Sequence, residues 1–143
     1  MEPTTSAEAA AHLFRGLRGG RLRNLTQEAD IIRFQVLLPQ VASVRNPDFT
    51  FFYCTLKGCS RFSLQPFRNT DTRVEELSTI ERLDMVIHSA KVSPGPVVSV
   101  LCGHKGVEDG ARLTIRSEHV QVWDEAFDPV TAPELERIQN QGS

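Results

Sequence analysis

Hydrophobic and polar residues alternate along several short stretches of the chain, which is the pattern of half-buried β-strands. In residues 30–38 (DIIRFQVLL) every second side chain is apolar, and this segment predicts a first strand. Residues 48–56 (DFTFFYCTL) are rich in aromatic and β-branched residues and predict a second strand. Residues 59–65 (CSRFSLQ) predict a third strand, and the Lys57–Gly58 pair between the two predicts a tight hairpin turn.

The same alternation returns near the end of the chain. Residues 97–103 (VVSVLCG) predict a fourth strand, and the Asp109–Gly110 pair predicts the turn of a hairpin. Residues 111–123 (ARLTIRSEHVQVW) predict the last strand. The apolar phase shifts within this segment, which predicts a β-bulge near Ser117–Glu118. The buried side of the last strand is expected to hold Leu113, Ile115, Val120 and Val122.

Two stretches have helical signals instead. Residues 7–17 follow Ser6, a good helix cap, and end before Gly19–Gly20, so they predict a short helix. Apolar residues between Val74 and His88 recur at close to helical spacing and predict a second helix. The end of that stretch, residues 84–92, also alternates like a strand, so both structures stay open there.

Two longer segments carry a family resemblance. The stretch SPGPVVSVLCGHKGVEDGARLTIRSEHVQVWDE resembles the end of many OB domains, and FFYCTLKGCSRFSLQPF resembles their second and third strands. The similarity covers residues 28–125 and is to single-strand-binding OB domains of the replication protein A type and of telomere-capping complexes. It implies a mostly β fold, a five-stranded OB-like Greek-key barrel with one helix between strands 3 and 4, plus the short N-terminal helix. It also implies a subunit that binds single-stranded nucleic acid.

Around this barrel, the charge pattern divides the chain into three parts. Residues 1–27 form the N-terminal helix and a basic arm, which either is solvated or docks on phosphate. Residues 28–125 form the OB-like domain. Residues 126–143 form an acidic C-terminal extension with a possible short helix at Pro133–Ile138, within a final stretch from residue 117 whose net charge is −5.

Composition restricts the class of protein. The 143 residues, 40% of them hydrophobic, fit one domain of ordinary size with its own core. The net charge of −2 excludes a molecule that is basic all over. An odd count of three cysteines does not describe a disulfide scaffold and favours a reducing, intracellular compartment, nucleus or cytoplasm. No apolar run approaches the roughly 20 residues of a membrane-spanning helix, so we expect no membrane partner.

The chemistry-bearing residues do not form a known catalytic or metal motif. YCTLKGC resembles the first half of a zinc ribbon found in one replication protein A domain, but the second cysteine pair is absent. The spacing of Cys54, Cys59, Cys102 and His104 is not one that zinc sites use, and free cysteines are often small core hydrophobes. Nucleophile-elbow, zinc-protease and phosphate-loop motifs are also missing from the sequence. We therefore expect no enzyme, no metal and no cofactor.

Nucleic-acid binding is the function that these residues favour. If Phe52, Cys54 and Leu56 face the core, alternation places Phe51 and Tyr53 outside, where bases could stack. The alternatives are that these aromatics are core or interface residues and that the basic residues are only solvated. The predicted non-catalytic site for single-stranded DNA or RNA consists of Phe51, Tyr53, Lys57, Arg61, Lys105, Arg112 and Arg116.

Protein binding is the main alternative. Aromatic residues are favoured at interface centres, so Trp123 and Phe127 are the predicted contacts to other protein subunits. These rings could also fold back over the barrel mouth. In this reading the chain is a protein–protein adaptor, or a structural β-protein such as a viral one, that uses its barrel as a scaffold.

Overall fold

One antiparallel sheet of nine strands accounts for most of the structure, a computed structural model that describes residues 6–66, 73–82, 85–94, 97–104 and 107–141. The strands are β1 (Arg21–Glu28), β2 (Ile31–Leu37), β3 (Phe51–Lys57), β4 (Arg61–Pro66), β5 (Val86–Ser93), β6 (Val97–His104), β7 (Val107–Arg116), β8 (His119–Trp123) and β9 (Pro129–Val130). The helices are α1 (Ser6–Gly16), α2 (Pro39–Arg45), α3 (Leu77–Arg82) and α4 (Ala132–Gln141). The expectation of a mostly β fold is confirmed. The expectation of five strands is wrong.

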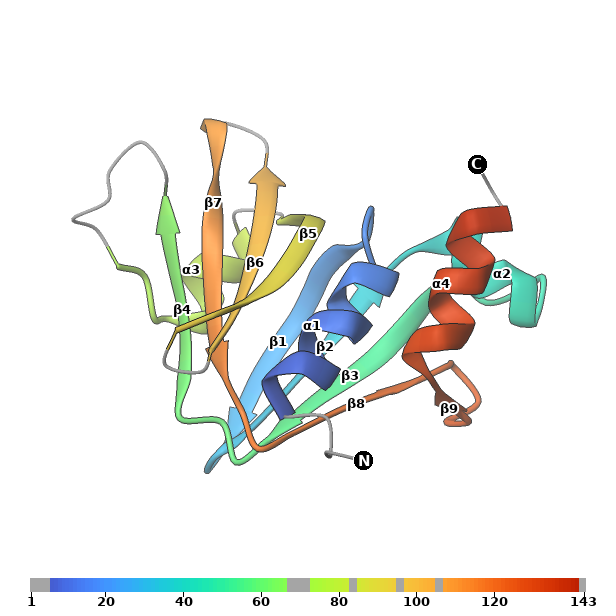
Figure 1. The fold of residues 1–143 in the computed structure, drawn as a ribbon, viewed down its shortest axis with the longest axis horizontal. Helices are drawn as coiled ribbons and strands as arrows, with labels where there is room; N and C mark the ends of the chain where they lie inside the picture. The colour runs from blue at the N-terminus through green and yellow to red at the C-terminus, as the bar shows by residue number, and fades with distance from the viewer. Residues whose placement is uncertain (1–5, 67–72, 83–84, 95–96, 105–106, 142–143) are drawn as a thin grey trace.

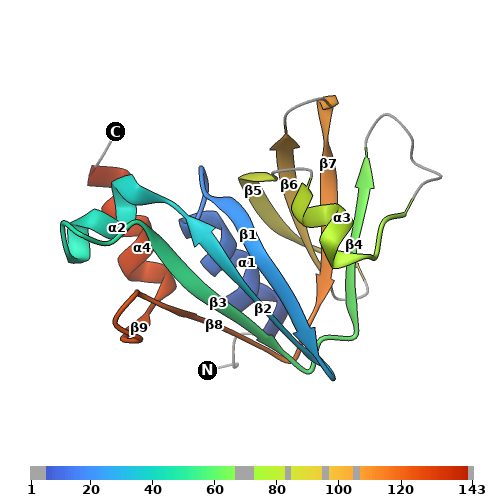
Figure 2. The ribbon, with the colours of Figure 1, turned by 180° about the vertical axis from the view of Figure 1, so that it is seen from behind.

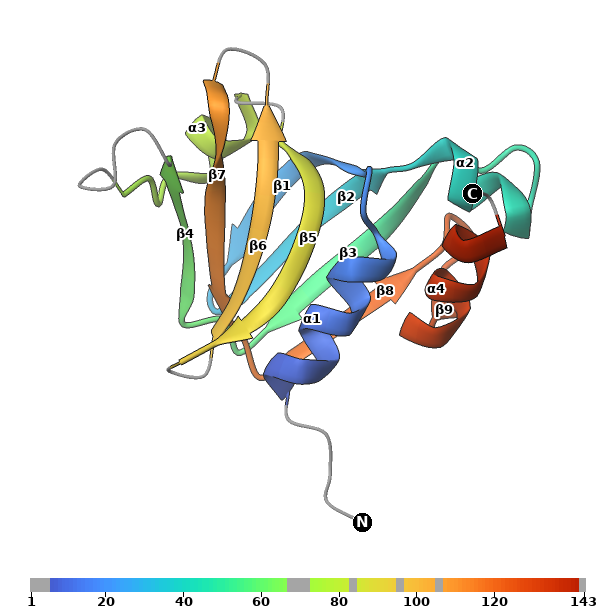
Figure 3. The same ribbon diagram turned by 45° about the horizontal axis from the view of Figure 1, so that its top comes forward.

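The strand order β4-β7-β6-β5-β1-β2-β3-β8-β9 divides the sheet into two halves that join between β5 and β1 (Figure 1). Each half contains a meander, β5-β6-β7 in one and β1-β2-β3 in the other. The sheet bends strongly between them, so that one face of each half points inward (Figure 3). The core fills this bend, where the ring of Phe34 on β2 lies 6.3 Å from that of Phe62 on β4 and 6.4 Å from that of Phe14 on α1.

The alternation predicted for β2 and β3 is confirmed by their burial. Phe34 and Val36 are buried on β2, as are Phe52, Cys54 and Leu56 on β3. Helix α1 packs against β5, β6, β8 and α4, and its Phe14 reaches Phe34 on β2. Its buried side is formed by Ala7, Ala10, Ala11, Leu13 and Phe14. In Figure 2 strands β1, β2 and β3 lie in front of α1, so this view looks at their opposite, outer face.

The predicted hairpin of the second and third strands is wrong. Strand β3 pairs with β2 and β8, whereas β4 pairs with β7. Lys57 and Gly58 therefore lead the chain from one half of the sheet to the other, with Gly58 at a φ of 64° that glycine adopts without strain. Cys59 then donates its amide to the carbonyl of Asp30, at the β1–β2 turn.

Asp109–Gly110 is not a turn either. The β6–β7 register pairs His104 with Val107, so the connection lies at residues 105–106, outside the described residues, and Asp109–Gly110 lies inside β7. The register slips between Cys102 and His104, opposite this glycine. Gly110 has a φ of 76°, and a Cβ on it would lie 2.4 Å from the carbonyl oxygen of Cys102. The glycine therefore serves a β-bulge, which uses the same backbone conformation as a tight turn.

Segments outside the predicted barrel also belong to the packed part of the described structure. The segment Arg21–Glu28, predicted as part of a basic arm, is instead β1 in the middle of the sheet. Pro39 begins α2, which the sequence did not indicate, and proline is well suited to the first turn of a helix. In the acidic extension, α4 buries Leu135 and Ile138 against the rest of the protein.

For residues 84–92, where helix and strand both stayed open, the described part is a strand, and the helix predicted from Val74 is shorter than expected. The helix α3 covers only Leu77–Arg82, and the alternating segment that follows is strand β5. The last predicted strand is divided at Ser117–Glu118, where the bulge was expected, into β7 and β8. None of the helices in the described part of the chain is long and apolar enough to cross a membrane.

Candidate functional site: an aromatic and basic sheet face

Four aromatic side chains gather on the outer face of β3 and β8. Tyr53 lies directly across from Trp123 in the β3–β8 ladder, and Phe51 precedes Tyr53 on the same face. The rings of Phe51 and Tyr53 meet edge to face at 5.0 Å. The ring of Phe127, from the turn after β8, stacks on Tyr53 with centroids 4.7 Å apart and planes at 7°. We call Phe51, Tyr53, Trp123 and Phe127 the aromatic face.

Alternation along the strands explains why these rings lie outside. Phe52 and Cys54 point into the core, so their neighbours on β3 point outward. Phe51, Tyr53 and Trp123 are half-buried, and Phe127 is exposed. Phe127 is 64% exposed, the most exposed large apolar side chain among the described residues. Isolated apolar residues on a surface are common, but contiguous aromatic rings mark binding sites.

Basic residues border the aromatic face. Lys57 lies at the end of β3, and Arg33 on β2 pairs with Thr55 between Lys57 and Tyr53. The next row across the sheet holds Arg23, Gln35, Tyr53 and Trp123. Arg33 also lies 3.8 Å from Glu28, but both side chains are more than half exposed, so this ion pair holds the arginine only weakly.

A cavity of about 260 Å³ lies on this face. Tyr53, Trp123 and Phe127 line it together with Arg33, Thr55 and Lys57, and its lining includes no carboxylate. Three larger cavities that are lined by arginine also carry a carboxylate, from Glu75, Glu118 or the Asp124–Glu134 group. A nearby carboxylate opposes an anionic ligand, so the cavity of the aromatic face is the one best suited to an anion with a flat apolar part.

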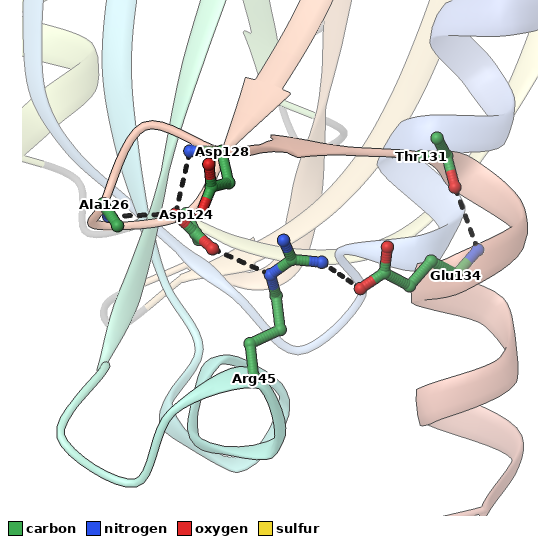
Figure 4. Close-up of polar contacts among 6 residues, drawn as sticks. All are labelled: Arg45, Asp124, Ala126, Asp128, Thr131 and Glu134. Carbon is green, nitrogen blue, oxygen red and sulfur yellow. Dashed lines mark hydrogen bonds and ion pairs between the residues drawn. The ribbon is translucent and has the colours of Figure 1, made fainter.

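The turn that carries Phe127 is held by Asp124, a buried carboxylate with an exposed fraction of 3%. Its Oδ1 accepts hydrogen bonds from the amides of Ala126 and Asp128, at 2.9 and 3.0 Å (Figure 4). The amide of Phe127 donates to the Asp124 carbonyl, and Phe127 has a φ of 63°. These hydrogen bonds thus hold Phe127 in a left-handed backbone conformation, in which its ring stacks on that of Tyr53.

Arg45 ties this turn to two helices (Figure 4). From α2 its Nε donates to Oδ2 of Asp124 at 2.9 Å, and its Nη1 donates to Glu134 on α4. Burial alone would raise the pKa of Asp124, but the hydrogen bonds from Arg45 and from the two turn amides together lower it below its ordinary value. The carboxylate therefore stays ionised, which keeps the turn closed at neutral pH.

Glu125 fixes the other side of the turn. Its Oε2 accepts from the amide of Thr50 at 2.5 Å and, at 3.4 Å, from that of Phe51. These bonds attach the β8–β9 turn to the start of β3, next to the rings that it supports. The aromatic face is thus a rigid part of the sheet rather than a set of rings on a loose loop.

The structure divides the predicted nucleic-acid residues into groups. Phe51, Tyr53 and Lys57 lie together on the aromatic face, and they are joined there by Trp123 and Phe127, which were predicted as protein contacts. Arg61 and Arg116 are cross-strand neighbours on β4 and β7. Arg112 is half-buried further along β7, opposite Gln65. Lys105 lies outside the described residues.

Sequence reasoning missed Arg33 and Arg23. The alternation of β2 puts Arg33 on the polar side of the strand with Gln35, so the sequence could have indicated that it is exposed. Its position beside Tyr53 depends on the β2–β3 register. Arg23 lies on a strand that the sequence did not predict.

Cys54 contributes to the lining of the cavity on the aromatic face but is itself a core residue. Cys54 and Cys102 are buried in the core, and burial raises the pKa of each thiol, to about 12 for Cys102. Among the described residues, no group of three or more histidine, cysteine or acidic side chains is placed to hold a metal ion.

No family model, curated protein or solved structure matches this chain. The site must therefore be interpreted from its own geometry.

Proposed function

We propose that the aromatic face binds single-stranded nucleic acid, DNA or RNA, without catalysing a reaction. The observation that carries this proposal is the meeting of Phe51, Tyr53, Trp123 and Phe127 with Arg33 and Lys57 on one outer sheet face. Proteins that hold single strands combine aromatic platforms for bases with cations for phosphates. The function is the one that the OB resemblance implied, but its support here is this surface.

Each part of the face has a role in this proposal. Tyr53 covers one side of the Phe127 ring, and the 64% exposure of Phe127 leaves ring surface on which a base can stack. Such stacking contributes about 1–3 kcal/mol per base. Arg33 and Lys57, which lie together toward the end of β3, would contact phosphates next to that base, which gives an affinity that falls with salt.

Protein binding through the same face is the second candidate. A large exposed ring beside a tyrosine and a tryptophan is also the composition of a protein-binding hot spot. The two candidates differ in their electrostatics, because only the first one releases condensed counterions from a phosphate backbone.

The first experiment titrates the protein with oligo-dT and with oligo-U at low and at high salt. Binding is followed by the anisotropy of a labelled oligonucleotide and by the fluorescence of Trp123, the only tryptophan in the chain. We expect quenching of Trp123 and an affinity that weakens steeply with salt. Phe127→Ala and Tyr53→Ala should each weaken binding by about 1–3 kcal/mol.

Val44→Ala is the matched control, because Val44 is a 60% exposed apolar residue on α2. It should bind like the wild type. Absence of binding at low salt and high protein concentration contradicts the proposal. Binding that is insensitive to Phe127→Ala, with Trp123 fluorescence unchanged, places nucleic acid elsewhere and also contradicts it.

A further inference from the structure

The strand junctions at one end of the aromatic face bring three cations together. Lys57 ends β3 and Arg61 begins β4, after the turn at residues 58–60. Arg61 is directly opposite Arg116 in the β4–β7 ladder, and all three side chains are exposed. We call Lys57, Arg61 and Arg116 the cationic corner.

The cationic corner continues the outer surface of the aromatic face. Tyr53, Thr55 and Lys57 share the outer side of β3. Arg61 and Arg116 are the sequence neighbours of the core residues Phe62 and Ile115, so their side chains belong to the outer faces of β4 and β7. The junction of β7 and β8 is bound to that of β3 and β4, because Ser117 Oγ donates to the Lys57 carbonyl at 2.7 Å and the Glu118 amide donates to it at 3.0 Å. Figures 1 and 3 both show these two junctions side by side.

The charges of the corner are not balanced within the described structure. Like charges directly opposite each other in a sheet are destabilising, so Arg61 and Arg116 form an unfavourable pair. Arg61 donates only to Ser63 Oγ, at 3.4 Å, and the ion pairs found among the described residues include none of the three cations. Two acidic residues lie near the corner: the carboxylate of Glu118 is beside Gly58, and Glu75 lines the same cavity as Arg61.

We propose that a single strand bound on the aromatic face runs on over the cationic corner, where its phosphates lie on Lys57, Arg61 and Arg116. The inference rests on the function proposed above and adds the path of the ligand. Anionic phosphates would relieve the repulsion between the two opposed arginines. It follows that a strand long enough to reach the corner binds more tightly than one that only fills the aromatic face.

The test compares oligo-dT of about 4 nucleotides with oligo-dT of about 12 nucleotides, within the range of single-strand site sizes. The variant is the double substitution Arg61→Gln with Arg116→Gln. For the longer strand, removal of two phosphate contacts should reduce the slope of log Kobs against log salt by about 1.4, at about 0.7 per contact. For the shorter strand, affinity, slope and Trp123 quenching should not change.

Two further variants sharpen the test. Glu118→Gln removes a carboxylate that lies beside the corner and should tighten binding of the longer strand only. Arg137→Gln removes an exposed arginine from α4 and should change neither strand, which controls for net charge.

The outcomes separate the two proposals. If both strands quench Trp123 but the double variant leaves the salt slope for the longer strand unchanged, the path over the corner is wrong and the aromatic site stands. If neither strand binds the wild-type protein, the proposed function itself fails. A loss of both strands in the double variant would also contradict the path, provided that its thermal unfolding matches that of the wild type.

Discussion

Phe127 combines two features that oppose stability. It has a φ of 63°, in the left-handed region where a side chain costs about 1 kcal/mol relative to glycine, and it exposes 64% of its surface. Its stack on Tyr53 offsets part of this, and such a contact contributes about 0.5–1.5 kcal/mol. A strained and exposed aromatic residue that is held by a hydrogen-bonded turn is typical of a functional position.

This balance predicts that two substitutions of Phe127 differ. Phe127→Ala removes the stack and keeps the strained backbone, whereas Phe127→Gly removes both, so the glycine variant should be more stable than the alanine variant by about 1 kcal/mol. Urea unfolding at neutral pH measures the difference. Equal stability of the two variants would show that the turn relaxes when the ring is lost. Both variants should still weaken oligonucleotide binding by about 1–3 kcal/mol.

Asp124 determines how the turn responds to pH. Its folded pKa lies below the ordinary value, so its stabilising effect is present above the unfolded pKa of about 4 and is lost as the pH falls through the lower folded pKa. Asp124→Asn leaves Arg45 without one of its two carboxylate partners. We expect it to lower the free energy of unfolding by about 3 kcal/mol at neutral pH.

Comparing the stability of wild type and Asp124→Asn at lower pH shows whether the charge of the Asp124 carboxylate causes the difference. Between neutral pH and pH of about 5 the difference between wild type and Asp124→Asn should stay constant, and below about pH 4 it should shrink. Asp128→Asn is the matched control, because Asp128 is an exposed carboxylate of the same turn. A difference that persists unchanged in acid would mean that the carboxylate charge is not what stabilises the turn.

At the scale of elements, α4 is a structural part of the domain. Leu135 is fully buried, and α1 approaches so closely that a Cβ on Gly16 would lie 2.6 Å from the Cβ of Leu135. Gln139 on α4 also donates to the carbonyls of Gly16 and Arg18 at the end of α1. Glu134 and Glu136 of the acidic extension thus lie on a helix that the N-terminal helix holds in place.

Removing this contact should destabilise the whole protein. Leu135→Ala should lower the free energy of unfolding by about 2–5 kcal/mol, because it leaves a cavity between α4 and α1. Arg137→Ala, two residues away and exposed, should change it by no more than about 0.5 kcal/mol. Thermal and urea unfolding provide the measurement. If Leu135→Ala is neutral, α4 is detached in solution.

Local patterns predicted the phase of the strands but not their partners. The alternation of β2 and β3 correctly separated core from surface, and with it placed Phe51 and Tyr53. The sequence did not predict strand β1, because its register slips between Arg23 and Thr26. This slip leaves only Leu22 and Leu25 buried in the strand and removes the alternation. A glycine at positive φ suits a tight turn, a corner or a bulge, so Gly58 and Gly110 were each assigned the wrong role.

For the candidate site too, the sequence predicted the residues but not how they come together. Phe51, Tyr53, Lys57, Trp123 and Phe127 were all named, because surface aromatics beside cations are informative in any fold. Their union into one face was not foreseeable, because Trp123 reaches Tyr53 through a pairing between strands β3 and β8 that are far apart in the sequence. The stack of Phe127 on Tyr53 depends on the turn that Asp124 holds.

At the scale of the whole molecule, the two halves of the sheet share little backbone pairing. The β1–β5 ladder registers Arg21 with Val86, and a few hydrogen bonds around Gly20 support it. The side chains provide the rest of the connection: Phe62 from the β4 half packs against Phe34 from the β2 half, which in turn stacks on Phe14. One core therefore spans both halves, and they should unfold together.

Phe62→Ala tests whether the two halves unfold together, because Phe62 lies in the half of the sheet that does not contain Trp123. The substitution should lower the free energy of unfolding by about 3–5 kcal/mol, because Phe62 is buried in the shared core. Trp123 fluorescence reports on the β3–β8 half and far-ultraviolet circular dichroism on both, so their transitions should shift together and coincide. A tryptophan transition that stays at its wild-type midpoint while part of the dichroism is lost earlier would show two separately folding halves. In that case the cationic corner would join two mobile parts, whereas a shared transition makes it a fixed continuation of the aromatic face.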